Sequence, residues 1–425
     1  MTRGAVGTAG SRLTVFLGAF GDAGHAFPML ALGSALVARG HEVHFETWKR
    51  WRPHAEAAGI HFADAPEYQV FPTESTKHLK PYAAAVKAAR ETGEMVAKIA
   101  PDVAVADIMT PAAALAAETA GVPVATLVPH VHPQMAPGFP IYSIGARLPR
   151  TRLGARFWTR MNARFVEPAL EQGRNQLNES RRRLGLAPLP YVHTMLSREL
   201  TLVGTLPQLE YPREWPSWAR VVGPLFWEPP GERVPPPPGE GPVVLVAPST
   251  AQDREHRLLR AALEGLAGEP VRVIATWNGR EPDPPIDVPP NAVLVPWLSY
   301  SQTMPLCDVV VCHGGHGTLV RALANGCPVV VCPAVGDMAE NASRVDWAGL
   351  GVRLPRRFAT PRGVRAAVSR ALGEPRLRER TRAVAAWVAA NDGRARAAAE
   401  LEAWADGRAH AAREAQPGLL DEPGR

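Results

Sequence analysis

Short runs of β-branched and aliphatic residues alternate with helical patterns along most of this 425-residue chain. Strands that alternate with helices at these lengths are typical of a parallel sheet covered by helices on both faces. In the first half, the predicted strands are 13–19, 42–47, 103–106 and 122–127, and the predicted helices are 27–39, 77–99 and 111–120. In the second half, the predicted strands are 243–247, 271–276, 293–295, 309–312 and 329–332, and a helix is predicted over 253–266.

A proline-rich segment separates the two halves. Residues 228–242 read Glu-Pro-Pro-Gly-Glu-Arg-Val-Pro-Pro-Pro-Pro-Gly-Glu-Gly-Pro. Proline lacks the N–H group that helix interiors and central strands need, so the segment predicts an extended linker. The predicted fold class is α/β, with two doubly wound, Rossmann-like domains that face each other across a cleft. The predicted parts are a domain over 1–228, a linker over 229–242, a domain over 243–393, a helical segment over 394–415 and a flexible tail over 416–425.

Residues 128–200 depart from the alternation. Glycine and proline punctuate 133–149, and an amphipathic helical pattern then runs from about 154 to 184. Such an excursion from a doubly wound domain often forms a lid or one wall of a substrate cleft. A surface insertion without a ligand is the alternative.

Charge and composition argue against several classes of function. The formal net charge is +6, but the arginines are scattered and no long basic run is interleaved with aromatic residues, so nucleic-acid binding is not expected. No apolar run is long enough to cross a bilayer, and the run 13–20 is too short for a signal peptide, so we expect a cytoplasmic protein without stable membrane insertion. The cysteines lie in the buried strands of the second half, which favours reduced core thiols; they are Cys307, Cys312, Cys327 and Cys332.

A glycine-rich turn follows the predicted strand 309–312. Residues 313–318 read His-Gly-Gly-His-Gly-Thr, and a helical pattern continues to Asn325. The free N–H groups of a helix N-terminus bind anions, so this turn predicts a phosphate or diphosphate site. A turn that needs glycine only for steric reasons is the alternative. The loop 333–337 follows the next predicted strand and would reach the same crevice, which favours the anion site.

Two side chains of the first half are candidates for proton transfer. His25 follows the first predicted strand, and Asp107 lies at the carboxyl end of another. Histidine is suited to accept a proton near neutral pH, and a carboxylate behind it fixes its tautomer and stabilises the imidazolium. A loop histidine with an ordinary hydrogen bond is the alternative.

Other residues of the second half suggest a metal or a nucleobase. The cysteines together with His313 and His316 do not have the spacing of paired zinc ligands, so no metal site is predicted. Trp297 follows the predicted strand 293–295. It is either a core or rim tryptophan or a platform on which a base stacks.

These motifs, in this order, resemble the family 1 nucleotide-sugar-dependent glycosyltransferases, in particular the actinobacterial enzymes that glycosylate macrolides, enediynes and related natural products. The resemblance covers about residues 12–405 and is most specific over 297–352. It implies the two-domain GT-B fold, an acceptor-binding N-terminal domain and a nucleotide-sugar-binding C-terminal domain. It also implies inversion at the anomeric carbon without a metal, with a TDP- or UDP-sugar as co-substrate and no further cofactor.

The resemblance also implies roles for individual residues. His25 is similar to the base that deprotonates the acceptor hydroxyl, and Asp107 to its carboxylate partner. Trp297 resembles the residue beside the nucleobase, and Asp337 the acid that binds sugar hydroxyls. The residues that resemble the diphosphate-binding set are His313, Gly315, Gly317 and Thr318.

Two positions differ from the pattern of the family. Met338 stands where a glutamine often follows the aspartate, and Arg321 stands where many members have a glutamate that binds the ribose. Fewer acceptors for sugar hydroxyls favour a deoxysugar on thymidine diphosphate.

Two other functions are compatible with these patterns. One is an NDP-sugar epimerase of the same fold, which would need carboxylates around the sugar, and no such cluster accompanies His25. The other is a non-catalytic homologue that binds a nucleotide sugar. The preferred function is transfer to a hydroxyl of a hydrophobic small molecule. The residues that would line its pocket or pack in the core are Phe71, Phe139, Tyr142, Phe157 and Trp158.

Overall fold

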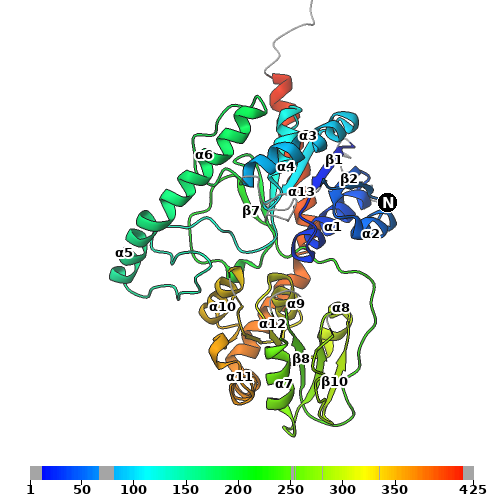
Figure 1. Ribbon diagram of the computed structural model, residues 1–425, viewed down its shortest axis with the longest axis vertical. Coiled ribbons are helices and arrows are strands. Elements are labelled where there is room, and N and C mark those ends of the chain that lie inside the picture. Colours follow the sequence, from blue (N-terminus) through cyan, green and yellow to red (C-terminus); the bar gives the residue numbers. More distant parts are fainter. Residues whose placement is uncertain are drawn as a thin grey trace, which may run out of the picture.

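The computed structural model describes residues 12–66, 81–249, 253, 255–279, 281–334 and 336–414. They form two α/β domains, one above the other in Figure 1, each built on a parallel sheet with helices on its faces. The described helices include none that is both long and apolar enough to cross a membrane.

The N-terminal domain is built on a sheet with the order β3-β2-β1-β4-β5-β6-β7, in which every neighbouring pair is parallel. Its strands are β1 (Thr14–Gly18), β2 (Glu42–Thr47), β3 (His61–Asp64), β4 (Val103–Asp107), β5 (Val124–Val128), β6 (Thr201–Val203) and β7 (Ala219–Val221). Its helices are α1 (Ala23–Ala38), α2 (Arg52–Ala57), α3 (Pro81–Ile99), α4 (Pro111–Thr119), α5 (Arg152–Met161) and α6 (Glu167–Arg183).

The C-terminal domain repeats this plan with the strand order β10-β9-β8-β11-β12-β13, again with parallel neighbours. Its strands are β8 (Val243–Ala247), β9 (Arg272–Thr276), β10 (Ala292–Val295), β11 (Val309–Cys312), β12 (Val329–Val331) and β13 (Gly351–Arg353). The helices of this half are α7 (Arg257–Leu266), α8 (Tyr300–Thr303), α9 (His316–Ala324), α10 (Asp337–Ala348), α11 (Pro361–Gly373), α12 (Pro375–Ala390) and α13 (Gly393–Glu414).

The central strands are buried on both faces. Every residue of β8 and of β11 is buried, and so are all residues of β4. This explains why their sequences are continuous apolar runs rather than alternating ones, as in other parallel sheets. The predicted fold class, two α/β domains with parallel sheets, is confirmed.

The last helix returns to the first domain. In Figure 1, α13 runs upward from the C-terminal domain beside α1. Its residues Ala397, Ala398 and Leu401 are part of the hydrophobic core of the N-terminal sheet. The Glu402 carboxylate accepts hydrogen bonds from the Arg39 guanidinium at 2.5 and 2.6 Å. The chain thus crosses between the domains twice, at residues 222–242 and again before α13.

Most elements agree with the sequence prediction. The predicted helix over 154–184 is present as α5, a π-helical turn at Asn162–Val166 and α6. The linker residues 229–242 contain no helix or strand. Strands β3, β6, β7 and β13 were not predicted, and each has only three or four residues. Residues 77–80 of the helix predicted over 77–99, and Phe71, lie outside the described residues.

Candidate active site

His25 and Asp107 meet at the carboxyl edge of the N-terminal sheet. His25 lies in the first turn of α1, and Asp107 is the last residue of β4, which pairs with β1. The His25 Nδ1 atom lies 2.8 Å from an Asp107 carboxylate oxygen. The Asp107 side chain is fully buried, whereas 20% of the His25 side chain is exposed. Because Nδ1 is engaged, Nε2 is the nitrogen available to a substrate.

The surroundings of His25 raise its pKa above the usual 6.5. Burial acts to lower the pKa, since it disfavours the charged ring, but the charge and hydrogen bond of Asp107 outweigh it. Asp22 and Asp337 raise the pKa further. Asp337 begins α10 in the other domain, so its charge acts on His25 across the domain interface.

A second histidine, which the sequence analysis missed, lies beside this pair. His130 follows β5, and its ring centroid is 6.4 Å from that of His25. Its Nδ1 atom lies 2.8 Å from the Val131 carbonyl oxygen and 3.5 Å from the Tyr142 hydroxyl. Burial lowers the pKa of His130. The rule that identified Asp107, a polar residue at the carboxyl end of a parallel strand, also applies to His130 after the predicted strand 122–127.

The glycine-rich turn lies between β11 and α9, as predicted. The ring of His313 is partly buried, with Nδ1 3.4 Å from the carbonyl oxygen of Ala247 at the end of β8. A Cβ atom on Gly315 would lie 2.4 Å from His313 Nε2, so only glycine leaves the ring in this place. The Asn341 amide of α10 donates to the Gly314 carbonyl at 2.9 Å and holds the turn from behind.

Gly317 and Thr318 lie in the first turn of α9, where backbone N–H groups have no partner within the helix. Gly317 is exposed and Thr318 is partly exposed. A small recess opens beside His313, and its lining includes Arg257, Arg356 and Asp253. Cationic side chains next to a helix N-terminus suit a phosphate group.

Asp337 occupies the first position of α10, one strand along from the glycine-rich turn. Its negative charge acts to raise the pKa of His25, and it acts in the same direction on the pKa values of His130 and His313. The carboxylate therefore lies near side chains of both domains. The structure brings together His25, Asp107, His313, Asp337 and the glycine-rich turn at the facing sheet edges.

Trp297 and Arg321 lie in the same domain. Trp297 follows β10 and is 47% exposed, so its ring is accessible to a ligand. Arg321 is directed at the residues that lead into the linker instead: it donates to the Trp227 carbonyl at 3.2 Å, and its guanidinium lies 3.8 Å from Glu228. Glu228 also accepts hydrogen bonds from Ser299 and Ser301. Arg321 thus anchors the linker to α9.

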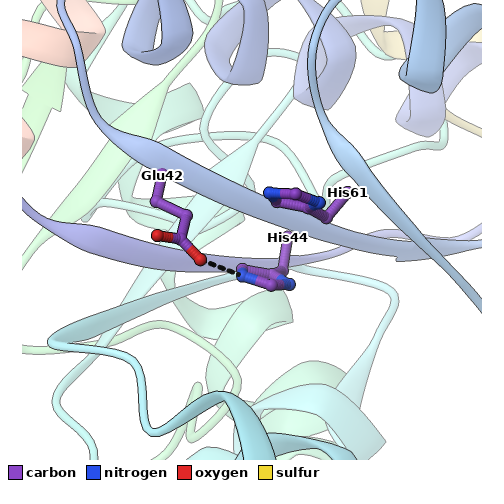
Figure 2. Close-up of side chains that lie close together, drawn as sticks. All are labelled: Glu42, His44 and His61. Atoms are coloured by element: carbon purple, nitrogen blue, oxygen red, sulfur yellow. Dashed lines mark hydrogen bonds and ion pairs between the residues drawn. The ribbon is translucent and has the colours of Figure 1, made fainter.

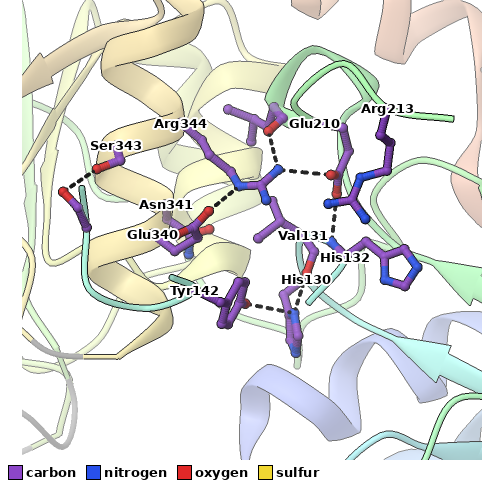
Figure 3. Close-up of polar contacts among 12 residues, drawn as sticks. His130, Val131, His132, Tyr142, Glu210, Arg213, Glu340, Asn341, Ser343 and Arg344 are labelled. Carbon is purple, nitrogen blue, oxygen red and sulfur yellow. Dashed lines mark hydrogen bonds and ion pairs between the residues drawn. The ribbon is translucent and has the colours of Figure 1, made fainter. Parts of the chain in front are cut away.

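A buried ionic cluster joins the two domains next to this site (Figure 3). Arg344 of α10 lies 2.9 Å from Glu210 of the N-terminal domain and 2.8 Å from Glu340 of its own helix. Glu210 also accepts a 2.7 Å hydrogen bond from the His132 backbone N–H. The segment that carries His130 is thereby linked to the helix that carries Asp337.

The pocket residues suggested by the sequence are dispersed. Tyr142 lies near His130, whereas Phe139 is buried against Tyr211. Phe157 is 53% exposed on α5, at the far end of the projection on the left of Figure 1. The aromatic residues of this segment therefore do not form one common wall.

Possible metal ligands gather elsewhere. Glu42, His44 and His61 lie at the amino-terminal ends of β2 and β3, the opposite ends from His25 (Figure 2). The two imidazole rings are stacked, with centroids 4.7 Å apart, and the His44 Nε2 atom lies 3.0 Å from a Glu42 carboxylate oxygen. The four cysteines are free thiols, and burial raises the pKa of Cys312 to about 12.

Comparison with known proteins identifies both halves of the chain. Residues 15–132 match the glycosyltransferase family 28 N-terminal domain, and residues 261–404 match the erythromycin biosynthesis protein CIII-like C-terminal domain. The 4'-demethylrebeccamycin synthase of Lentzea aerocolonigenes is 30% identical over 384 residues, which cover 84% of this chain and 90% of that protein. The O-mycaminosyltylonolide 6-deoxyallosyltransferase of Streptomyces fradiae is 31% identical over 52% of this chain and 54% of its own.

Solved structures agree with this assignment. The calicheamicin glycosyltransferase CalG4 superimposes with a TM-score of 0.71 at 25% identity, over 92% of this chain and 98% of its own. VinC, solved in complex with dTDP, has a TM-score of 0.69 at 18% identity over 93% and 100% of the two chains, which shows a shared fold. The chain is therefore a glycosyltransferase of the GT-B fold and belongs to the family of actinobacterial natural-product glycosyltransferases.

Proposed function

We propose that the protein is an inverting glycosyltransferase that moves a sugar from a nucleotide-diphosphate donor to a hydroxyl of a hydrophobic small molecule, as in secondary metabolism. The observation that carries this proposal is the 2.8 Å contact between His25 and Asp107, with the Asp337 carboxylate acting on His25 from the other domain. A base and a donor-binding edge thus face each other.

In the proposed reaction, His25 Nε2 accepts the proton of the acceptor hydroxyl. The acceptor oxygen forms its bond to the anomeric carbon while the bond between that carbon and the diphosphate oxygen breaks. A single displacement of this kind inverts the anomeric configuration. The buried Asp107 carboxylate stabilises the imidazolium that forms, and the nucleoside diphosphate leaves with the electron pair.

The leaving diphosphate would bind at the glycine-rich turn. His313, the N–H groups of Gly315 and Gly317, and the hydroxyl of Thr318 supply donors there. Preorganised donors of this kind stabilise the charge that develops on a leaving group. We therefore propose that transfer needs no metal ion; turnover should be retained after treatment with a chelator. Trp297 would stack on the nucleobase, and Asp337 would bind sugar hydroxyls.

We further propose that the donor is a deoxysugar on thymidine diphosphate. Arg321 is occupied by the linker and offers no carboxylate to a ribose, and Met338 offers no hydrogen-bonding group to a sugar. A UDP-sugar is the alternative donor. Hydrolysis or transfer with matched TDP-deoxysugar and UDP-glucose donors decides between them, and a clear preference for UDP-glucose would reject the thymidine donor.

The role of His25 is tested with the variant His25→Ala. Turnover should fall by roughly 10²–10⁴-fold, whereas the affinity for thymidine diphosphate should stay unchanged. His44→Ala is the matched control, because His44 also contacts a carboxylate, Glu42 at 3.0 Å, but at the opposite end of the sheet. Full turnover by His25→Ala, or the absence of turnover in the unaltered protein with all donors, would contradict the proposal.

A further inference from the structure

Helix α5 and the π-helical turn that follows it carry two neighbouring rows of residues spaced by four. Side chains four residues apart lie on the same face of a helix. One row is entirely arginine and the next is entirely apolar. The rows are Arg152, Arg156, Arg160 and Arg164, and Leu153, Phe157, Met161 and Phe165.

The rows continue through the π-helical turn. In an ideal α-helix, a row of residues spaced by four turns by about 40° at each step. The backbone N–H of Glu167 bonds to the Asn162 carbonyl, five residues back, so this turn is wider than an α-helical one. A wider turn reduces this drift for Arg164 and Phe165.

Both rows are exposed to solvent except at Met161, which is half-buried. Leu153 is 76%, Phe157 53% and Phe165 55% exposed, and all four arginines are exposed. Among the residues that the structure describes, no carboxylate lies within ion-pair distance of the four arginines. The sequence contains no aspartate or glutamate from 119 to 166. Nearby arginines outside the rows are paired: Arg147 lies 2.8 Å from Asp346, and Arg183 lies 3.0 Å from Glu179.

The position of α5 makes this face accessible to a large flat partner. Figure 1 shows α5 at the outer end of a projection that stands away from both sheets. The apolar row forms a ridge on a helix rather than a groove. A ridge of this kind fits a deformable surface that closes around it, and the arginines beside it, which have no carboxylate partner among the described residues, favour a surface with negative charge.

We propose that α5 docks the protein on a membrane surface rich in anionic lipid. The helix would lie in the plane of the interface, with Leu153, Phe157 and Phe165 among the acyl chains and the arginines on lipid phosphates. An apolar row flanked by arginines is the pattern of interfacial helices. Such docking is reversible and peripheral. It is independent of the chemistry at His25, and it places the acceptor-binding domain at the surface where apolar molecules accumulate.

The test uses the full chain and sedimentation with vesicles. Vesicles of equal parts phosphatidylglycerol and phosphatidylcholine should bind the protein, vesicles of phosphatidylcholine alone should not, and added salt should weaken binding. The double variant Leu153→Ser/Phe157→Ser should lose binding. Arg156→Gln/Arg160→Gln should weaken it about tenfold or more.

Arg182→Gln/Arg183→Gln is the matched control, because it removes the same charge from α6, where both side chains pair with Glu179. It should bind vesicles as the unaltered protein does. Turnover of a water-soluble acceptor, measured without vesicles, should be the same for Arg156→Gln/Arg160→Gln, for Arg182→Gln/Arg183→Gln and for the unaltered protein. Equal binding to both vesicle types, or no loss in either α5 variant, would overturn the proposal. So would a dimer in solution that dissociates in Leu153→Ser/Phe157→Ser without any vesicle binding, because the face would then bind a second protein chain.

Discussion

At the scale of single residues, the pair His25 and Asp107 depends on a difference in burial. The carboxylate has no exposure and accepts a 2.9 Å hydrogen bond from the Met109 backbone N–H, which helps to hold it against the ring. The ring remains partly exposed at the edge where the other domain begins. A fixed carboxylate behind an accessible imidazole selects one tautomer and stabilises the charged ring.

The first prediction concerns the pH dependence of turnover. A base must be neutral, and the pKa of His25 is raised, so kcat/KM should rise with pH with a midpoint above 6.5. In Asp107→Asn, burial remains but the negative charge is lost and the hydrogen bond from the ring has only a neutral acceptor, so the midpoint should move to lower pH. The maximal rate should fall by roughly 10²-fold or more, because the imidazolium is less stable. The measurement is a pH profile of kcat/KM for both proteins.

Asp22→Asn is the control for this experiment. Asp22 also raises the pKa of His25 by its charge, but this effect is smaller than that of Asp107, and the Asp22 side chain is 64% exposed. Its side chain caps α1 by accepting from the Ala23 N–H, and asparagine caps helices equally well. A small shift of the midpoint with an unchanged maximal rate is expected. A profile of Asp107→Asn that coincides with that of Asp22→Asn would show that the Asp107 contact has no role in catalysis.

The raised pKa of His25 also makes the free energy of unfolding depend on pH. The folded state binds the proton more tightly than the unfolded state, so this group adds stability below about pH 6.5, where both states are protonated. That contribution is lost as the pH rises through the pKa of the folded protein. The pH at which His25 is an effective base is therefore the pH at which it no longer stabilises the fold.

At the scale of elements, the apolar strands are the part that the sequence predicts best. Residues 309–312 and 243–247 are buried on both sides, and only a strand inside a covered parallel sheet needs such a run. The short strands β3, β6, β7 and β13 lie at or next to a sheet edge, and they were missed because three or four residues are too few to show an apolar period. Thr201–Val203 is an example: its burial comes from neighbours that are distant in sequence.

The site was predictable where a side chain follows a recognised strand. His25, Asp107, His313 and Asp337 were found in this way, and His130 could have been. Arg344 could not, because it lies inside a helical pattern and its partner Glu210 is 134 residues away in a segment without strand or helix signals. Contacts of that kind depend on how the two domains pack against each other, and the local apolar patterns of the sequence give no information about that packing.

The second prediction concerns the turn between β11 and α9. Gly315 has an ordinary backbone conformation, so alanine is permitted there except for the contact of its Cβ with the His313 ring. Gly315→Ala should displace the ring and weaken the affinity for thymidine diphosphate about tenfold or more, the effect of losing a hydrogen bond to a charged group. Calorimetric titration with thymidine diphosphate measures this, and melting curves show that the fold is retained.

The control is Gly173→Ala in α6, where a Cβ atom would meet nothing within 4 Å. Alanine is the better helix former by about 0.5–1 kcal/mol, so this variant should be as stable as the unaltered protein or slightly more stable, with unchanged affinity. An affinity of Gly315→Ala equal to that of the control would mean that His313 does not contact the diphosphate.

At the scale of the whole molecule, the two domains are joined by more than the linker. Helix α13 packs on the N-terminal core, and Arg344 of α10 is buried against Glu210 and beside the Tyr211 ring. The pKa of Arg344 is raised: burial lowers it, and the two glutamates outweigh that effect. The buried cluster thus holds α10, with Asp337 at its start, against the segment that carries His130.

The third prediction removes this cation. Arg344→Met keeps most of the side-chain volume but leaves Glu210 and Glu340 buried without their partner. Breaking a buried ion pair by removal of one partner costs about 3–5 kcal/mol, so the free energy of unfolding should fall by that order. We expect kcat/KM to decrease, because the cluster holds the two domains together beside the active site. Thymidine diphosphate should still bind, because its proposed site lies in the C-terminal domain. Denaturant melts, kinetics and calorimetry measure the three quantities.

Arg147→Met is the matched control, because Arg147 also connects the N-terminal domain to α10. It lies 2.8 Å from Asp346, but its side chain is 76% exposed. An exposed pair contributes about 0–1 kcal/mol, since water solvates both charges. If the two variants destabilise the protein equally, burial of the Arg344 cluster is not what holds the domains together. If Arg344→Met lowers stability but leaves kcat/KM unchanged, the cluster supports the fold without setting the distance between His25 and Asp337, and the alignment of the two sheet edges must come from α13 and the linker.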